Sequence, residues 1–290
     1  MSGRLRYTCV HPAGPGRLEI GTPPLATASV SPGGPGQDAV LADASGPADL
    51  HAFLLSAALG IAWDAGASRL VEEASGRVFP VEDAPVPRAA VSVLPLRETA
   101  RGLEAFVQHR VRTMDFAPGA VVFPGGRVDP ADAARGTLLA LPADAPPLGF
   151  PAAETGVFSD IRTALAAGVR ELHEETGAAV DPARLVPWDN WITPLGYPRR
   201  FDVAFFLLAV EPGDALAHAT TEASASDWIA VSDLVDQVNA GTLAMVPPTS
   251  ALVDEIAALG SLDAALGLRP RVVPIRHDLD ARRPRVPGGH

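Results

Sequence analysis

The stretch Gly168-Val169-Arg170-Glu171-Leu172-His173-Glu174-Glu175-Thr176-Gly177 carries three acids within five residues. Glu174 and Glu175 follow Glu171 by three and four residues, so a helix places the three carboxylates on one face. Like charges at these spacings destabilise a helix by about 0.2–0.5 kcal/mol per pair. A hard divalent ion that takes oxygen ligands relieves this repulsion. A solvated acidic face gives the same pattern. The stretch therefore predicts a helix whose acids either bind a metal ion or face solvent.

The residues upstream favour the metal site. Val121-Val122-Phe123 is a short β-branched and aromatic run, and the Pro124-Gly125-Gly126 that follows is typical of a turn. Glycine has no side chain, so such a turn brings bare backbone close to whatever a facing helix holds. We therefore expect this strand to end beside the acidic helix.

Together these segments resemble the Nudix box, in which Gly, five residues, Glu and seven residues precede Arg-Glu-hydrophobic-x-Glu-Glu-x-Gly. The second half matches at every fixed position, and the first half begins at Gly126. Asp132 stands where the family has Glu, and about thirty extra residues, Ala133 to roughly Arg162, precede Arg170. Their richness in Ala, Pro and Gly predicts an inserted surface loop. Loop-closure entropy grows only logarithmically with length, so this insertion is tolerable.

A similar interruption is a feature of one Nudix branch, the peroxisomal coenzyme A diphosphatases of animals. Between about residues 88 and 255 the flanking segments also resemble that branch and its bacterial relatives: Phe116-Ala117-Pro118-Gly119, Asn190-Trp191-Ile192-Thr193-Pro194, Pro198-Arg199-Arg200-Phe201-Asp202 and Pro247-Pro248-Thr249. The resemblance implies an α/β fold, the Nudix-type α/β/α sandwich with a mixed sheet. It also implies hydrolysis of a phosphoanhydride bond with Mg²⁺ or Mn²⁺ as cofactor.

The same resemblance implies which residues carry the chemistry. The metal ligands would be Glu171, Glu174, Glu175 and a backbone carbonyl of the turn, assigned to Gly125. The catalytic residues would be Glu174, Glu171, Arg170 and Glu222. Arg170 would pair with a loop acid, for which Asp132 is the candidate. Glu222 is a base or ligand in one interpretation and a solvated loop acid in the other. His173 lies about 100° around the helix from its neighbours, so we expect it to face away.

Three arginines are candidates for substrate binding. Arg199 and Arg200 suit a phosphate held by bidentate hydrogen bonds, with a surface pair beside a strand as the alternative. Arg110 fits the register of a motif that resembles the one in family members acting on coenzyme A. Val111 and Asp115 depart from that motif, and an acid in place of a cation repels phosphate. The substrate class is therefore less sharply predicted than the reaction.

Composition narrows the class of protein. The chain has 290 residues, of which 47% are hydrophobic, which predicts a sizeable core. Its formal charge of −11 argues against a nucleic-acid binder. A single cysteine, Cys9, allows no internal disulfide and no zinc site built on several thiolates. No signal peptide pattern opens the chain, and the apolar run Ala52 to Trp63 is too short to span a bilayer. We expect a soluble cytoplasmic protein with a small-molecule partner.

Three regions follow from the pattern of prolines and periodicities. Residues 1–86 are expected to form a small α/β domain of unknown role, an accessory or dimerisation domain that would make the protein a homodimer. A proline-rich linker is expected at 79–88. Residues 87–268 would be the Nudix domain with its insertion at about 133–162, and 269–290 a Pro/Arg-rich, partly disordered tail.

Local patterns predict the elements of each region. Strands are expected at 4–10, 17–20, 68–73, 89–96, 104–109, 119–123, 191–193, 202–210 and 227–231. Helices are expected at 47–65, 161–176, from 232 onward and at 249–259. Asp160 or Ser159 is the expected N-cap of the acidic helix. Trp191 and Phe201 suit the core better than a base-stacking platform.

Two functional hypotheses result. In the first, the chain is a pyrophosphohydrolase of an X-linked nucleoside diphosphate, with coenzyme A or an acyl derivative as the best single substrate. In the second, the chain is a non-catalytic nucleotide-binding or regulatory protein that keeps the Nudix fold. The substitution at Asp132 and the insertion motivate the second hypothesis.

Overall fold

The structure of the chain is a computed structural model that describes residues 10–14, 17–20, 26–46, 54–55, 58–59, 61–62, 65–81, 86–111, 119–139, 161–193, 199–268 and 274–276. The chain divides into two compact units, the first running to Pro87 and the second beginning at Arg88. The short segment Ile192–Phe201 groups with the first unit. Within the described residues, no helix is both long and apolar enough to cross a membrane.

The first unit is built on a six-stranded sheet in the order β1-β2-β3-β4-β5-β6. Its strands are β1 Val10–Gly14, β2 Arg17–Ile20, β3 Ala26–Ser31, β4 Ala39–Ser45, β5 Arg69–Glu72 and β6 Arg77–Pro80. Neighbouring strands are antiparallel except β4 and β5, which are parallel. A parallel pair needs a crossover connection. Described helical residues between β4 and β5, at 54–55, 58–59 and 61–62, belong to that crossover.

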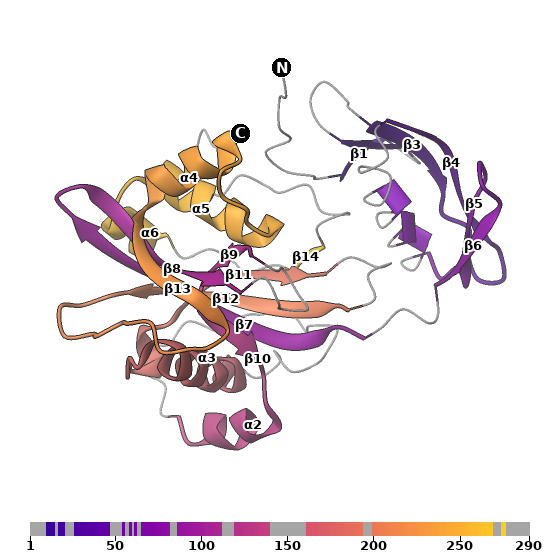
Figure 1. The fold of residues 1–290 in the computed structure, drawn as a ribbon. Helices are drawn as coiled ribbons and strands as arrows, with labels where there is room; N and C mark the ends of the chain where they lie inside the picture. The colour runs from indigo at the N-terminus through magenta and orange to yellow at the C-terminus, as the bar shows by residue number, and fades with distance from the viewer. Residues whose placement is uncertain are drawn as a thin grey trace. The chain divides into compact units, whose positions relative to one another are not determined.

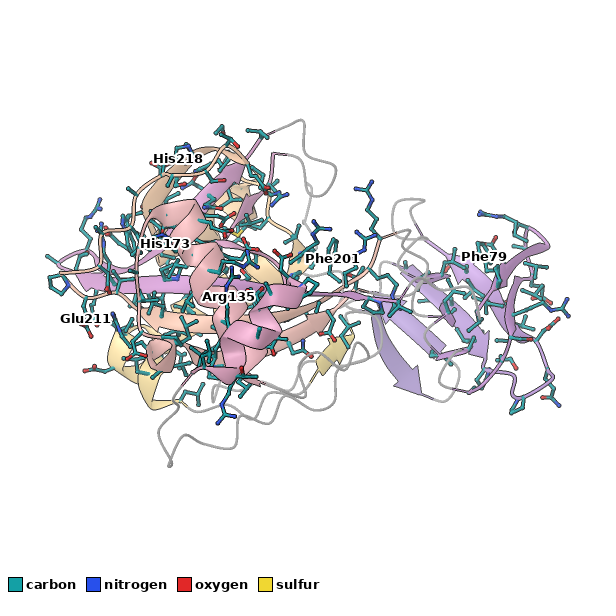
Figure 2. The ribbon with its side chains drawn as sticks, turned by 90° about the horizontal axis from the view of Figure 1, so that it is seen from below. Phe79, Arg135, His173, Phe201, Glu211 and His218 are labelled. Carbon is teal, nitrogen blue, oxygen red and sulfur yellow. The ribbon has the colours of Figure 1, made fainter. Side chains whose placement is uncertain are left out.

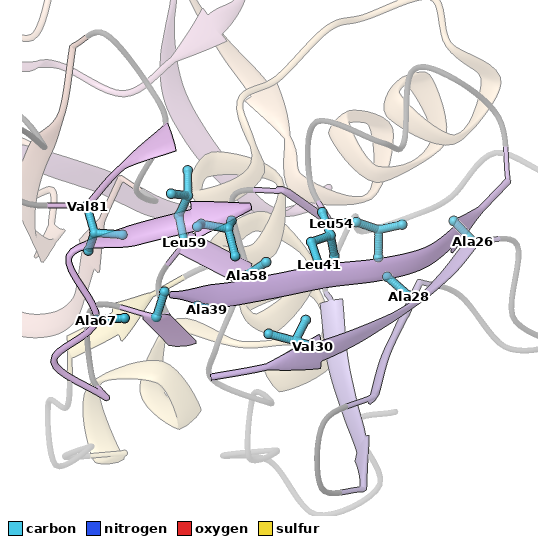
Figure 3. Packing of buried hydrophobic residues seen from close by; sticks show 12 residues of the cluster. Ala26, Ala28, Val30, Ala39, Leu41, Leu54, Ala58, Leu59, Ala67 and Val81 are labelled. Carbon is cyan, nitrogen blue, oxygen red and sulfur yellow. The ribbon is translucent and has the colours of Figure 1, made fainter. Parts of the chain in front are cut away.

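The crossover covers one face of this sheet. Leu54, Ala58, Leu59 and Ala62 are buried in one cluster with alternate residues of β3 and β4 (Figure 3). Val30 and Leu41 point into the same cluster because side chains two apart on a strand share a face. The first unit therefore has its own apolar core, as expected of a separate domain.

The second unit is built on an eight-stranded sheet. Along the main path the order is β13-β8-β7-β12-β11-β14, with β9 beside β8 and β10 beside β7. Its strands are β7 Arg88–Thr99, β8 Gly102–Arg110, β9 Val121–Val122, β10 Gly125–Arg127, β11 Val186–Ile192, β12 Phe201–Ala209, β13 Ala223–Ala230 and β14 Pro274–Arg276. β7 and β8 form an antiparallel hairpin in which Thr99 pairs with Gly102. Gly102 has a φ of 95°, which favours glycine.

Helices cover both faces of this sheet (Figure 1). α2 Pro130–Thr137 and α3 Ile161–Thr176 lie on one side, and α4 Val231–Ala240, α5 Pro247–Leu259 and α6 Leu262–Gly267 lie on the other. A short 3-10 helix, η2 Pro182–Arg184, follows α3. The expected α/β/α sandwich is confirmed. The expected α5 and the start of α4 are also confirmed.

α3 is held to the sheet by its apolar stripe. Ala164, Leu165 and Leu172 pack against Val91, Val93 and Phe206 in one buried cluster. At Gly168 an added Cβ would lie 3.1 Å from Leu185 Cδ1, so glycine allows the helix to approach closely. The acids lie on an adjoining stripe of α3, in which Glu175 is itself buried. The amphipathic pattern thus fixes which way the acids face.

The structure corrects several expectations. The insertion does not begin as a loop, because Pro130–Thr137 is helical and Asp129 caps it through a capping box with Asp132. Phe79 and Pro80 end strand β6 and so are not linker. Strands β3 and β4 were missed, since their Ala and Ser content carries little β-propensity. β11 begins at Val186, earlier than expected.

Other expectations fall partly or wholly outside the described residues. These are the strand at 4–10 apart from Val10, the cap at Ser159 or Asp160, and most of the insertion and the tail. Within the tail, Pro274–Arg276 is ordered as strand β14 at the sheet edge.

The close packing of α2 on α3 gives the first prediction. A Cβ on Gly136 would lie 2.8 Å from the backbone of Arg162 and Thr163, which cannot yield as a side chain does. We expect Gly136→Ala to lower the free energy of unfolding in urea by about 1–3 kcal/mol through overpacking. Gly213→Ala is the matched control, because nothing lies within 4 Å of its added Cβ. Equal midpoints for the two variants would contradict this packing.

Candidate functional site

The acids of α3 meet Gly125 and Gly126, which were expected in a turn but begin strand β10. The Gly125 N–H donates to Glu175 Oε2 at 2.9 Å. A Cβ on Gly126 would collide with the carboxylate of Glu171, so that carboxylate lies directly against the bare backbone. The turn and the helix are 50 residues apart in sequence, and the sheet brings them together. The expected approach of turn and helix is confirmed.

Arg170 gathers the acids into one cluster. Its Nε and Nη2 donate to the two oxygens of Asp132 at 3.0 and 2.8 Å. Its Nη1 donates to Glu171 Oε1 at 2.9 Å and to Glu174 Oε2 at 3.0 Å. Nη2 also donates to the carbonyl of Arg127 at 2.9 Å. One guanidinium thus joins α2, α3 and the end of β10.

Asp132 takes the part expected of the loop acid. It is fully buried, and the Asp129 N–H and Arg135 Nη1 donate to it as well. Burial alone would raise the pKa of Asp132, but hydrogen bonds from Arg170, Asp129 and Arg135 lower it overall. The predicted Arg170–Asp132 pair is confirmed. Asp132 reaches Arg170 because α2 packs against α3, which compensates for the shorter side chain.

The remaining carboxylates are held in an unfavourable setting. Burial, with the charges of Glu171 and Glu222, raises the pKa of Glu175 to about 7, although hydrogen bonds from Gly125 and Gln108 oppose the shift. Burial also raises the pKa of Glu171; the Arg170 charge opposes this shift, and the charges of Glu174 and Glu222 add to it. Crowded, desolvated acids of this kind are a feature of functional sites.

Glu222 reaches the cluster through the loop that precedes β13. The Ala217 N–H donates to the Thr176 carbonyl and the Ala219 N–H to the Glu175 carbonyl, each at 3.0 Å. These bonds fasten the loop to the C-terminal end of α3, where carbonyls lack helical partners. Glu222 itself is exposed, yet its charge raises the pKa of both Glu171 and Glu175. Its place near the acids supports the interpretation as base or ligand.

The donor set suits a hard cation, but the carboxylates are not arranged around a common point. Within the described residues, no group of three or more His, Cys, Asp or Glu side chains has that arrangement. The reason is that Arg170 Nη1 engages Glu171 and Glu174. Both acids would turn from Arg170 to hold an ion together with Glu175. All of these candidate ligands are oxygen atoms, and the single charge of Arg170 does not balance the charges of the three helix acids. Both features fit Mg²⁺ or Mn²⁺.

The structure also places the histidine of α3 and the three arginines predicted to bind substrate. His173 is exposed and its Nδ1 faces the Ala178 carbonyl, as expected of a residue turned away. Arg110 ends β8 and its N–H donates to the Ala120 carbonyl. Arg199 is exposed, whereas Arg200 is buried with its Nε on the Thr193 carbonyl, so the two are not a surface pair. Their role as phosphate ligands stays a prediction.

Two aromatic residues and one amide complete the comparison with the sequence. Trp191 is buried, as expected for the core, and its Nε1 donates to Asp189 at 2.9 Å; Phe201 is half-buried. Gln108 on β8 was missed, although it lowers the pKa of Glu175 and is 3% exposed. A polar residue directly after the apolar run Ala105-Phe106-Val107 was the available signal. Figure 2 shows His173 on α3 and His218 on the loop that reaches that helix.

Comparisons with known proteins show what a chain with this α/β/α sandwich and acidic helix is similar to. A curated Caenorhabditis elegans protein named "Putative nudix hydrolase 7" is 31% identical over 175 residues, which are 56% of this chain and 57% of that protein. The crystal structure of a NUDIX hydrolase from Alicyclobacillus acidocaldarius has a TM-score of 0.53 and 24% identity, covering 62% of this chain and 96% of its own. No family model matches the chain.

The chain is thus similar in sequence to a protein named as a nudix hydrolase, and its second unit shares the fold of a NUDIX hydrolase. The chain spans a little over half the length of the curated relative. The resemblance to the coenzyme A diphosphatase branch stays a prediction.

The raised pKa of Glu175 gives the second prediction, made for the metal-free protein in EDTA. Because the pKa of Glu175 is about 7 in the folded state, against 4.5 for an ordinary glutamate, the wild type binds more protons when folded. The stability that Glu175 contributes is therefore fully present below pH 4.5 and is lost as the pH rises through about 7. The loss is up to about 3 kcal/mol, since one pH unit between two pKa values corresponds to about 1.36 kcal/mol.

Glu175→Gln removes this titration while keeping an acceptor for the Gly125 N–H. We expect the variant to be more stable than the wild type at pH 8, with the difference shrinking by pH 5. Thermal unfolding across this range measures it. A difference that does not change with pH would show that Glu175 is not a crowded, buried carboxylate.

Proposed function

We propose that the chain is a divalent-metal-dependent hydrolase that cleaves a phosphoanhydride bond in an X-linked nucleoside diphosphate. The observation that carries the proposal is the gathering of Glu171, Glu174 and Glu175 around the Gly125-Gly126 turn and Arg170. The name of the 31% identical relative, a nudix hydrolase, supports the same reaction class.

The residues divide the work as follows. Glu171, Glu174 and Glu175, with the Gly125 carbonyl, would hold Mg²⁺ or Mn²⁺, which when bound neutralises phosphate charge and makes water more nucleophilic. Arg170 keeps the helix acids in place through its bidentate bond to Asp132. Glu222, which is exposed and whose charge acts on Glu175, would accept a proton from the attacking water.

Coenzyme A or an acyl derivative is the substrate class that we propose. Support comes from the interrupted box and the flanking segments, and from Arg110, which follows Gln108 by two residues on β8 and so lies on the same face. An anionic substrate needs local cations in a chain with a formal charge of −11. Arg110, Arg199 and Arg200 are the proposed ones. Cytoplasmic location and a homodimer formed through residues 1–86 are further proposals.

One of the two observations that motivated a non-catalytic, regulatory protein no longer supports it. The replacement of the family's Glu by Asp132 suggested a degenerate box, but Asp132 binds Arg170 through both oxygens. The insertion remains as a ground, although its ends leave α2 and α3 packed together. The geometry therefore favours the enzyme.

The third prediction tests the reaction. Purified full-length protein with Mg²⁺ or Mn²⁺ is expected to cleave at least one member of a panel of dinucleotides, nucleotide sugars and coenzyme A esters. Glu174→Gln is expected to lower kcat by about 10²-fold or more, because a metal contributes several kcal/mol of charge stabilisation. Glu174 is 55% exposed, so the variant should fold.

Glu211→Gln is the matched control, since Glu211 is also exposed and its partner Arg184 keeps Asp214. Its activity should equal that of the wild type. Full activity in Glu174→Gln would remove the metal assignment. Inactivity over the whole panel, with nucleotide-induced thermal stabilisation in EDTA, would support the regulatory alternative instead.

A further inference from the structure

Gln108 faces the same side of the sheet as the acidic helix. It belongs to β8, where it pairs with Val122 of β9 and with Ser226 of β13. In the hairpin, Arg97 of β7 lies opposite Glu104 of β8, so their side chains share a face. Counting by twos along each strand adds Val93 and Val91 on β7 and Gln108 on β8 to that face.

That face is the one that α3 covers. Val91 and Val93 are buried together with Ala164, Leu165 and Leu172 of α3. Gln108 is therefore directed toward α3 and away from the side that α4 covers. Its partner Val122 lies three residues before Gly125, whose N–H donates to Glu175 Oε2. The register thus brings the Gln108 amide and the Glu175 carboxylate to the same part of the sheet.

The Gln108 side-chain amide is buried and has a hydrogen-bond donor without an acceptor. Gln108 is 3% exposed, and among the described residues its Nε2 has no partner at hydrogen-bond geometry. A buried donor without an acceptor costs stability. The Glu175 carboxylate is a near neighbour of this amide, but the two groups are not in standard hydrogen-bond contact. A carboxylate that moved toward Nε2 would supply the missing acceptor.

We infer that Gln108 is a positioning residue, which donates from Nε2 to the carboxylate of Glu175 when that carboxylate holds a divalent cation. With the Gly125 N–H on one oxygen, a second donor would fix the carboxylate in its plane. Hydrogen-bonded carboxylate ligands hold a cation better than free ones, since fewer orientations compete. The inference rests on the proposed function only in its assignment of Glu175 as a metal ligand.

The experiment measures Mn²⁺ affinity of the full-length chain without substrate, by electron paramagnetic resonance of the free ion. Gln108→Met keeps the size of the side chain and removes the amide. We expect Mn²⁺ to bind about tenfold more weakly, since outer partners of metal ligands contribute about 10–100-fold. Asn190→Leu is the matched control. Its amide is also buried and its Oδ1 has no partner among the described residues, although its Nδ2 donates to Asp202 and to the Val203 carbonyl; it lies on β11, three strands from β8.

A double-mutant cycle shows whether Gln108 acts through Glu175. In the Glu175→Gln background, Gln108→Met is expected to cause no further loss of Mn²⁺ affinity. If Gln108→Met fails to fold, Gln108→Asn keeps an amide that is too short to reach, and the same weakening is expected.

The outcomes separate the inference from the proposed function. Equal Mn²⁺ affinity of Gln108→Met and the wild type overturns the inference and leaves the hydrolase proposal standing, as does an undiminished loss in the Glu175→Gln background. A raised KM with unchanged Mn²⁺ affinity would show that Gln108 contacts substrate, which also overturns it. A wild type that binds no Mn²⁺ overturns both.

Discussion

The bidentate bond between Arg170 and Asp132 is the interaction on which the site depends. It joins α3 to α2, and the same guanidinium reaches Glu171, Glu174 and the Arg127 carbonyl. A buried ion pair is tolerable only when its remaining donors and acceptors are satisfied. Here Asp132 accepts from Asp129, Arg135 and Arg170, and Arg170 uses Nε, Nη1 and Nη2. The rigidity of the box follows from this full set of bonds.

Because Arg170 is bonded to Asp132 and to two helix acids, its single positive charge is shared among three carboxylates. Arg170 faces Asp132, Glu171 and Glu174, and Glu175 and Glu222 lie close by. Arg135 bonds to Asp132, so Arg170 is the cation that Glu171 and Glu174 share, and burial and mutual repulsion still raise the pKa values of Glu171 and Glu175. Such a site is most stable with a further cation. This electrostatic argument supports the proposed metal without relying on any family resemblance.

The fold keeps these acids in place from two more directions. The Gly125-Gly126 turn supplies an N–H to Glu175 and room for Glu171, because neither glycine has a Cβ. The loop before β13 is bonded to the last carbonyls of α3. The helix is thus fixed at its acidic face and at its C-terminal end. A long insertion between α2 and α3 is compatible with this, since none of these contacts passes through it.

The sequence by itself determined the acidic helix, because the spacing of its residues follows local helix rules. The resemblance to the Nudix box implied the Arg170 partner. Only the tertiary structure decided the rest. Strands β3 and β4 are poor in β-branched residues and depend on their neighbours. α2 exists because Asp132 both caps it and binds Arg170 from 38 residues away. Gln108 and Glu222 reach the acids through strand pairing and loop docking, and such long-range contacts leave no periodic signal in the chain.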